Sequence, residues 1–226
     1  AGFCLHPAGW RAECPEKKER KAWRDMNILI TGGAGYIGSV TTEMLLDQGH
    51  KVVVFDNLER GHRRAVDRRA LFIKGDLRKR LQVERAIGKS RPEAVLHFAA
   101  YALVGESMEQ PAMYFRNNVE GSLNLAEAML DAGVPRIVFS SSCATYGQPE
   151  TPAITEDTAQ RPTNPYGESK LVFEKMLGWY GRLRNLHSVV LRYFNAAGAS
   201  GKYGEDHDPE THLIPNVLKA ALGLRP

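Results

Sequence analysis

The sequence predicts an α/β protein built on a doubly wound parallel sheet with helices on both faces. Short apolar runs alternate with stretches of helical spacing from residue 27 onward. The runs are continuous rather than alternating with polar residues, which is typical of strands buried on both faces. A glycine-rich turn, TGGAGYIG, joins the first run to the first helical stretch. Strand–helix alternation of this kind indicates parallel strands with crossover helices.

The elements follow in a regular order. The expected strands are the apolar runs NILIT, KVVVFD, ALFIKGD, EAVLHFAA, RIVFSSS and HSVVLRYF, at residues 27–31, 51–56, 70–76, 93–100, 136–142 and 187–194. The expected helices lie at residues 35–49, 77–88, 111–132 and 166–183. In the first helix Ile37, Val40, Met44 and Leu45 recur at helical spacing, and Gly49 ends it.

Composition and charge narrow the class of protein. The chain of 226 residues can form one core and part of a second. No apolar run approaches the roughly 18 residues of a membrane span. Three cysteines without C-x-x-C spacing indicate no metal site and a reducing, cytoplasmic location. The arginines between residues 60 and 80 are interpreted as a solvated basic face, since the single Phe among them, Phe72, does not give the aromatic interleaving that nucleic-acid stacking would require.

The chain divides into three regions. Residues 1–25 lack a clear period and the apolar core of a signal peptide, so we expect a disordered extension. Met26 opens MNILITGG, which reads like a natural protein start. Residues 26–194 form the expected dinucleotide-binding domain, and residues 195–226 are interpreted as the beginning of a smaller, truncated C-terminal substrate domain.

The glycine-rich turn indicates a dinucleotide site. Gly32, Gly35 and Gly38 lie between a strand and a helix, and the next strand ends in Asp56. Glycines let a pyrophosphate approach the backbone, and the helix N-terminus supplies N–H donors. Asp56 favours NAD over NADP, because it accepts hydrogen bonds from ribose hydroxyls and repels a 2′-phosphate. A tight turn without a ligand is the alternative, and Arg60 and Arg63 leave NADP open.

A second motif indicates proton transfer. Tyr166 and Lys170, in NPYGESK, share one helix face at i and i+4. A lysine ammonium and an oxidised nicotinamide both stabilise phenolate, so the tyrosine can take the proton of a substrate hydroxyl. Ser142 ends a core strand at the sheet edge where such folds bind ligands, and it is expected to orient that hydroxyl. The alternative for Tyr166 and Lys170 is an ordinary surface pair.

These motifs together resemble the extended short-chain dehydrogenase/reductase family, whose cofactor domain is Rossmann-like, and within it the UDP-hexose 4-epimerases. The resemblance covers residues 26–226. Its segments are TGGAGYIGS, DNL, GDL, HFAA, VGES, RNNVEGS, FSSSCATYG, YGESK, RYFNAAGA and GEDHDPETHLIP. The last two are more specific to 4-epimerases than the others.

The resemblance implies roles for individual residues. The implied catalytic set is Ser142, Tyr166 and Lys170. The implied cofactor-binding residues are Gly32, Gly35, Tyr36, Ile37, Gly38, Asp56, Asn57, Asp76, Leu77, Phe98, Ala99, Ala100, Asn117, Tyr166, Lys170 and Phe194. The implied substrate-binding residues are Ser142, Tyr166, Asn195, His212 and Leu213. No metal is implied.

The implied activity is NAD-dependent epimerisation at C4 of a UDP-hexose, UDP-glucose or UDP-galactose, through a transient 4-keto intermediate. A UDP-pentose 4-epimerase is an alternative. A 4,6-dehydratase is another, but such enzymes carry an Asp-Glu pair directly after the Ser/Thr, where this chain has Cys143 and Ala144. Family members continue past residue 226, so the chain is expected to be a fragment that binds NAD without activity, and the full-length form a homodimer.

Overall fold

The structure, a computed structural model, describes residues 25–150, 153–207, 210 and 212–224. Its centre is a six-stranded, all-parallel sheet in the order β3-β2-β1-β4-β5-β6. The strands are β1 Asn27–Thr31, β2 Lys51–Asp56, β3 Leu71–Lys74, β4 Ala94–His97, β5 Arg136–Ser142 and β6 His187–Tyr193. This order reverses between β1 and β4, and such a reversal is where open α/β sheets bind ligands.

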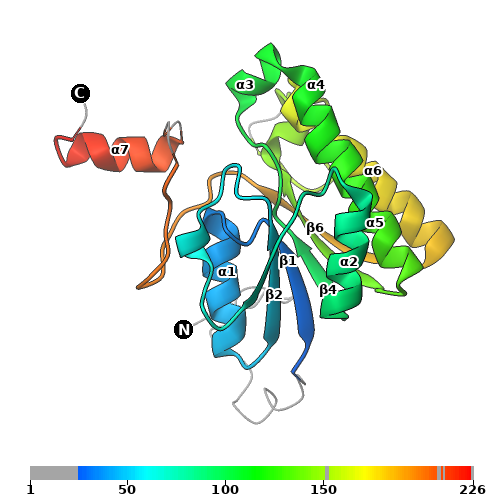
Figure 1. The fold of residues 1–226 in the computed structure, drawn as a ribbon. Coiled ribbons are helices and arrows are strands. Elements are labelled where there is room, and N and C mark those ends of the chain that lie inside the picture. Colours follow the sequence, from blue (N-terminus) through cyan, green and yellow to red (C-terminus); the bar gives the residue numbers. More distant parts are fainter. Residues whose placement is uncertain (1–24, 151–152, 208–209, 211, 225–226) are drawn as a thin grey trace, which may run out of the picture.

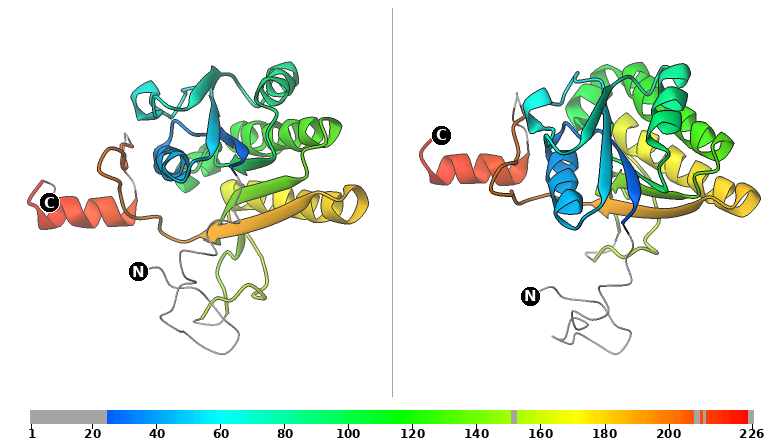
Figure 2. Two further views of the ribbon diagram at one scale, coloured as in Figure 1. Left: turned by 90° about the horizontal axis from the view of Figure 1, so that it is seen from below. Right: turned by 60° about the horizontal axis from the view of Figure 1, so that its bottom comes forward.

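Helices cover both faces of the sheet, as the sequence predicts. The helices are α1 Tyr36–Asp47, α2 Arg80–Ser90, α3 Val104–Glu109, α4 Pro111–Tyr114, α5 Gly121–Asp131, α6 Pro165–Arg184 and α7 Leu213–Ala221. Helix α1 stands on one side of the sheet, whereas α2, α5 and α6 stand on the other (Figures 1 and 2). The predicted fold class is therefore confirmed.

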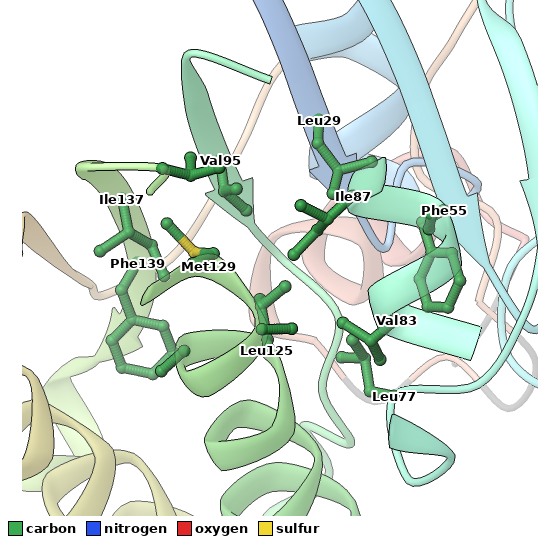
Figure 3. Packing of buried hydrophobic residues seen from close by; sticks show 14 of the residues in the cluster. Leu29, Phe55, Leu77, Val83, Ile87, Val95, Leu125, Met129, Ile137 and Phe139 are labelled. Carbon is green, nitrogen blue, oxygen red and sulfur yellow. The ribbon is translucent and has the colours of Figure 1, made fainter. Parts of the chain in front are cut away.

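Two buried clusters hold these layers together. The larger one joins Leu29, Val95 and Phe139 of the strands to Ile87 and Leu125 of the helices (Figure 3). The smaller cluster, on the α1 face, contains Ile28, Ile30, Val52, Val54 and Val66. Adjacent residues of β1 thus enter opposite clusters, because successive side chains of a strand point to opposite faces.

The edge strands correct the expectation that every strand is buried on both faces. In β3 Leu71 is 44% exposed, and in β6 Val189 and Leu191 are 54% and 38% exposed. Val190, between the two exposed residues, packs against the larger cluster. The described helices therefore leave the α1-side face of β6 open. An apolar run alone does not reveal whether a strand lies at the centre or at the edge of a sheet.

The boundaries of two helices also differ from those expected, and one further helix is unexpected. The helix expected from residue 77 begins at Arg80, because Asp76 forms a side-chain turn with the backbone N–H of Arg78 and its carbonyl accepts from Lys79. The helix expected over 111–132 is α4, a π-helical segment η3 (Phe115–Glu120) and α5. Helix α3 was not anticipated.

Helix α7 lies apart from the sheet and its helices in all three views (Figures 1 and 2). It has no buried residue, and Leu213, Val217, Leu218 and Leu222 are more than half exposed. Apart from Asp25, the extension expected over residues 1–25 lies outside the described residues. Within the described part of the chain, no helix is both long and apolar enough to cross a membrane.

Candidate active site

A cavity of about 410 Å³ opens at the carboxyl ends of the central strands. Its walls come from the glycine loop, the ends of β2, β4 and β5, the start of α6 and the chain after β6. All the site residues named from the sequence line it, except Leu213, which is 62% exposed outside it. The fold therefore gathers residues that are up to 180 positions apart, Gly32 and His212, at one place.

The glycine loop is shaped by close backbone contacts. Gly32 has a φ of +74°, and a Cβ there would lie 2.5 Å from the backbone nitrogen of Ala99. A Cβ on Gly38 would lie 2.2 Å from the carbonyl oxygen of Gly32. Gly35 is the N-cap of α1 and offers no side chain, so the first N–H groups of the helix carry no side-chain cap. Such a helix start can hold an anionic group.

Asp56 ties the glycine loop to the end of β2. Its Oδ2 accepts the backbone N–H of Ala34 at 3.0 Å, and its Oδ1 accepts the N–H of Leu58 at 2.8 Å. Burial raises the pKa of the Asp56 carboxyl, and the two backbone hydrogen bonds oppose this rise. The carboxylate lines the cavity, and each oxygen has a further lone pair available for a ligand hydroxyl.

The loop after β4, which forms one wall of the cavity, is positioned by an asparagine. Asn118, in η3, donates from Nδ2 to the Tyr101 carbonyl and to Ser169 Oγ, both at 3.0 Å, and accepts the Tyr101 N–H at 2.9 Å. This buried side chain joins the loop after β4 to α6. The neighbouring Asn117 faces the cavity, so the π segment places one asparagine in the core and one in the site.

Local sequence fixes the start of α6 beside Ser142. The Asn164 side chain accepts the N–H of Gly167 at 2.8 Å, which makes it the N-cap. A Cβ on Gly167 would lie 2.5 Å from the carbonyl oxygen of Ala144, so the helix approaches the turn after β5 closely. Burial raises the pKa of Tyr166, and a hydrogen bond with the Ser142 side chain opposes this rise. The serine and tyrosine expected to act together therefore influence each other, and both line the cavity.

Lys170 is buried below Tyr166. Its Nζ donates to the carbonyl oxygen of Ser140 at 2.8 Å and lies 5.8 Å from the centre of the Tyr166 ring. Burial lowers the pKa of Lys170 to about 7, and the charge of Glu174 opposes this effect. The sequence predicts a full ammonium charge here. The structure instead places this lysine where its protonation changes near neutral pH.

The chain after β6 closes the far side of the cavity. Phe194, Asn195 and His212 line it. Four side chains of this segment, Glu205, His207, Glu210 and His212, place possible ligand atoms within 4.8 Å of one another. Hydrogen bonds among them account for this convergence: His212 Nδ1 lies 2.8 Å from Glu210 Oε1, and His207 Nδ1 lies 2.9 Å from Glu205 Oε1.

Sequence reasoning missed several residues of the cavity wall. Gly61 packs so closely that a Cβ would lie 2.8 Å from the backbone of Ala34, and the next residue, His62, donates its N–H to the Ala34 carbonyl. Glu205 and His207 also line the wall. The only signal for Gly61 is a glycine soon after the acidic end of the second strand, and this is too common to identify a site.

Comparison with known proteins gives consistent matches. The model of the NAD dependent epimerase/dehydratase family matches residues 28–225. The UDP-glucose 4-epimerase of Lactobacillus helveticus is 50% identical over 199 residues, which cover 87% of this chain and 60% of that protein. The chain thus spans about 60% of the length of the curated relatives it matches.

Solved structures show the same similarity. UDP-glucose 4-epimerase from Brucella ovis in complex with NAD superposes with a TM-score of 0.84 at 50% identity, over 88% of this chain and 62% of that one. The enzyme from Bifidobacterium longum in complex with NAD+ and UDP gives a TM-score of 0.81 at 37% identity, over 87% and 62% of the two chains.

Proposed function

The chain belongs to the NAD dependent epimerase/dehydratase family, and on this premise we propose that it binds NAD and carries the catalytic residues for epimerisation at C4 of a UDP-hexose. The observation that carries this proposal is that Tyr166 and Ser142 line the same cavity as the glycine loop and Asp56. Residues 26–194 are the proposed NAD-binding domain, and residues 195–226 belong to a substrate-binding region.

The residues present fit a dinucleotide. Gly32 and Gly38 leave no room for a Cβ, whereas a Cβ on Gly35 would meet nothing closer than 3.5 Å. Gly35 is therefore open toward the cavity, where the uncapped start of α1 can accept a pyrophosphate. Asp56 would hold the adenosine ribose. The other proposed cofactor contacts are Tyr36, Ile37, Gly38, Asn57, Asp76, Leu77, Phe98, Ala99, Ala100, Asn117, Lys170 and Phe194.

The chain's own residues would transfer the proton. The Tyr166 phenol, kept neutral by burial, can donate its proton, and as phenolate it can accept the proton of the C4 hydroxyl. The Ser142 hydroxyl, which lines the cavity together with Tyr166, would hold the substrate oxygen in line with the phenol. When bound, NAD supplies a hydride acceptor and a positively charged ring. A protonated Lys170 would add positive charge below the phenol and favour phenolate.

UDP-glucose and UDP-galactose are the proposed substrates. This choice rests on the similarity of the chain to UDP-glucose 4-epimerases that are about 50% identical to it. Asn195 and His212 line the cavity and are proposed to contact the UDP-sugar. Leu213 lies outside the cavity, so its proposed contact requires a movement of the start of α7. We place the enzyme in the cytoplasm.

The whole protein is proposed to be a homodimer. Trp179 and Leu183, one turn apart on the outer side of α6, are 57% and 71% exposed. Large apolar side chains that cluster on a surface are typical of interaction sites. Sedimentation of the whole protein, with Leu183→Glu as the variant, tests this proposal. A monomer at micromolar concentration before any substitution contradicts it.

Cofactor binding can be tested on the chain itself. Fluorescence or calorimetric titration should show tighter binding of NAD than of NADP. Asp56→Ala should narrow this difference, because it removes both the ribose acceptor and the charge that repels a 2′-phosphate. Equal affinities for the two cofactors in the unmodified chain would overturn the role given to Asp56, and binding of neither would overturn the proposed function.

Substrate conversion is tested on a protein of the relatives' length. The chain should be joined to the C-terminal region of the Lactobacillus helveticus relative, and supplied with UDP-galactose in the absence of added external NAD. We expect UDP-glucose as the product. NAD titration of the same chimera controls for folding of the cofactor domain. Accumulation of a 4-keto-6-deoxy sugar would assign a dehydratase activity instead.

A further inference from the structure

The loop after β2 carries two opposite signals for cofactor choice. Asp56 is the acidic residue that suits the ribose hydroxyls of NAD. Arg60, four residues later, also lines the cavity. An arginine near this position is the residue that accommodates the 2′-phosphate of NADP in dinucleotide-binding folds. A preference for NAD therefore requires that the guanidinium of Arg60 does not bind the 2′-phosphate of NADP.

The structure shows what holds this guanidinium. Nη2 of Arg60 lies 2.5 Å from Oε1 of Glu106, in α3, and the guanidinium stacks over the Tyr101 ring at 5.2 Å. The Glu106 side chain is 23% exposed, compared with 47% for Arg60. The hydrogen bond with Glu106 raises the pKa of Arg60.

Glu106 is itself fixed in place from its other side. Its Oε2 lies 2.8 Å from the hydroxyl of Tyr114, a fully buried residue that also bonds to the carbonyl of Leu103 at 2.7 Å. The two hydrogen bonds, with Tyr114 and Arg60, lower the pKa of Glu106 against the effect of burial. A carboxylate oriented by the core thus presents one oxygen to Arg60.

The neighbouring arginines do not replace Arg60. The guanidinium of Arg63 stacks over Phe72 at 4.6 Å, and Arg64 pairs with Asp206 at 2.5 Å. Neither residue lines the cavity. Among the described residues, Arg60 is thus the only arginine in this cavity.

We propose that Glu106 is a specificity-determining residue of the dinucleotide site, which disfavours a 2′-phosphate by holding Arg60 in an ion pair. This inference rests on the proposed function. Asp56 repels the phosphate directly, whereas Glu106 removes the cation that would attract it. Specificity of this kind depends on unfavourable interactions with the wrong ligand as much as on contacts with the right one.

The test uses adenosine 2′,5′-bisphosphate and 5′-AMP as probes, because they differ only in the 2′-phosphate. Glu106→Gln keeps the side-chain shape and an oxygen that can accept from Tyr114, but loses the charge that holds Arg60. We expect the affinity ratio of the bisphosphate to 5′-AMP to rise about tenfold, typical of one gained charge-assisted hydrogen bond. The rise should shrink with added salt.

Two further variants identify the cause. Arg60→Ala in the unmodified chain should change the ratio less than twofold, because Glu106 already occupies the guanidinium. In the Glu106→Gln background, the same substitution should remove the whole gain. Glu109→Gln, on the same helix, is the matched control for the loss of one negative charge.

The outcomes separate the two proposals. A tenfold loss from Arg60→Ala alone, an equal gain from Glu109→Gln, or no change in Glu106→Gln overturns the role of Glu106. Failure of the unmodified chain to bind either probe or NAD overturns the proposed function instead. If Glu106→Gln does not fold, as judged by circular dichroism, the Arg60→Ala variant still tests the proposal. A change of less than twofold in its affinity ratio supports the role of Glu106, and a tenfold loss overturns it.

Discussion

Lys170 donates from Nζ to the carbonyl oxygen of Ser140 at 2.8 Å, inside the protein and directly below the phenol of Tyr166. The carbonyl belongs to β5 and the lysine to α6, so this bond joins the strand that carries Ser142 to the helix that carries Tyr166. One buried lysine therefore fixes the geometry of the site and, when protonated, contributes its charge.

Burial of Lys170 should make stability depend on pH. Its pKa is lowered to about 7 in the folded chain, and an unfolded lysine titrates near 10. Between these values the unfolded state binds more protons, so the free energy of unfolding rises with pH. Relative to Lys170→Met, the unmodified chain should gain up to about 1.4 kcal/mol per pH unit above pH 7.

Urea unfolding of both chains at pH 6, 7, 8 and 9 measures this difference. Lys175→Met, at an exposed position of the same helix, is the control. Its free energy of unfolding should change with pH in the same way as that of the unmodified chain. A difference between Lys170→Met and the unmodified chain that stays constant with pH would show that Lys170 keeps its proton throughout.

Tyr166→Phe should preserve the fold and NAD affinity but lose turnover in the chimera. Removal of a general acid–base group costs about 10²–10⁴-fold. Tyr180→Phe, a tyrosine on the same helix outside the cavity, is the control. Measurement of kcat and NAD affinity for both variants separates catalysis from binding. Turnover of Tyr166→Phe at the unmodified rate would leave the tyrosine with a structural role alone.

The glycine loop allows stability and binding to be tested separately. Gly38→Ala forces a Cβ to within 2.2 Å of the Gly32 carbonyl oxygen, and such overpacking costs about 1–3 kcal/mol. Gly35→Ala meets only an ordinary 3.5 Å contact, so stability should stay within about 0.5 kcal/mol. We expect it to weaken NAD binding nonetheless, because the methyl group fills space needed by the pyrophosphate. Unchanged NAD affinity in Gly35→Ala would place the pyrophosphate elsewhere.

His97 should make the fold sensitive to acid. It is buried between Thr31 Oγ1 at 2.6 Å and Ser122 Oγ at 2.8 Å, and burial, together with the charge of Lys170, lowers its pKa to about 3. Between pH 6.5 and 3 the unfolded state binds the extra proton, so stability falls as the pH falls.

His97→Gln should lower stability at pH 7, because the side-chain hydrogen bonds of the imidazole are disturbed. It should also make the free energy of unfolding fall less steeply as the pH is lowered below 6.5. His187→Gln, at an exposed position, serves as the control. Urea midpoints between pH 7 and 4 give the comparison. If His97→Gln loses stability as steeply as the unmodified chain when the pH falls, other groups cause the acid sensitivity.

Much of the fold follows from local pattern. The continuous apolar runs and helical stretches predict all six strands and the helices α1, α2, α5 and α6, because period and burial are properties of neighbouring residues. The glycine loop, Asp56 and the Tyr166–Lys170 spacing identify the candidate site for the same reason. Each of these motifs is short, and its chemistry depends on residues that lie close together in sequence.

Only the tertiary structure decided how the residues interact across the fold. Strand order places β6 at an edge, and this exposes Val189 and Leu191 although the run is as apolar as the others. Burial moves the pKa of Lys170, and an ion pair with Glu106 occupies Arg60. Residue type and spacing determine which groups are present. Desolvation and long-range pairing, which arise when distant segments pack, determine the charge and the partner that each group has.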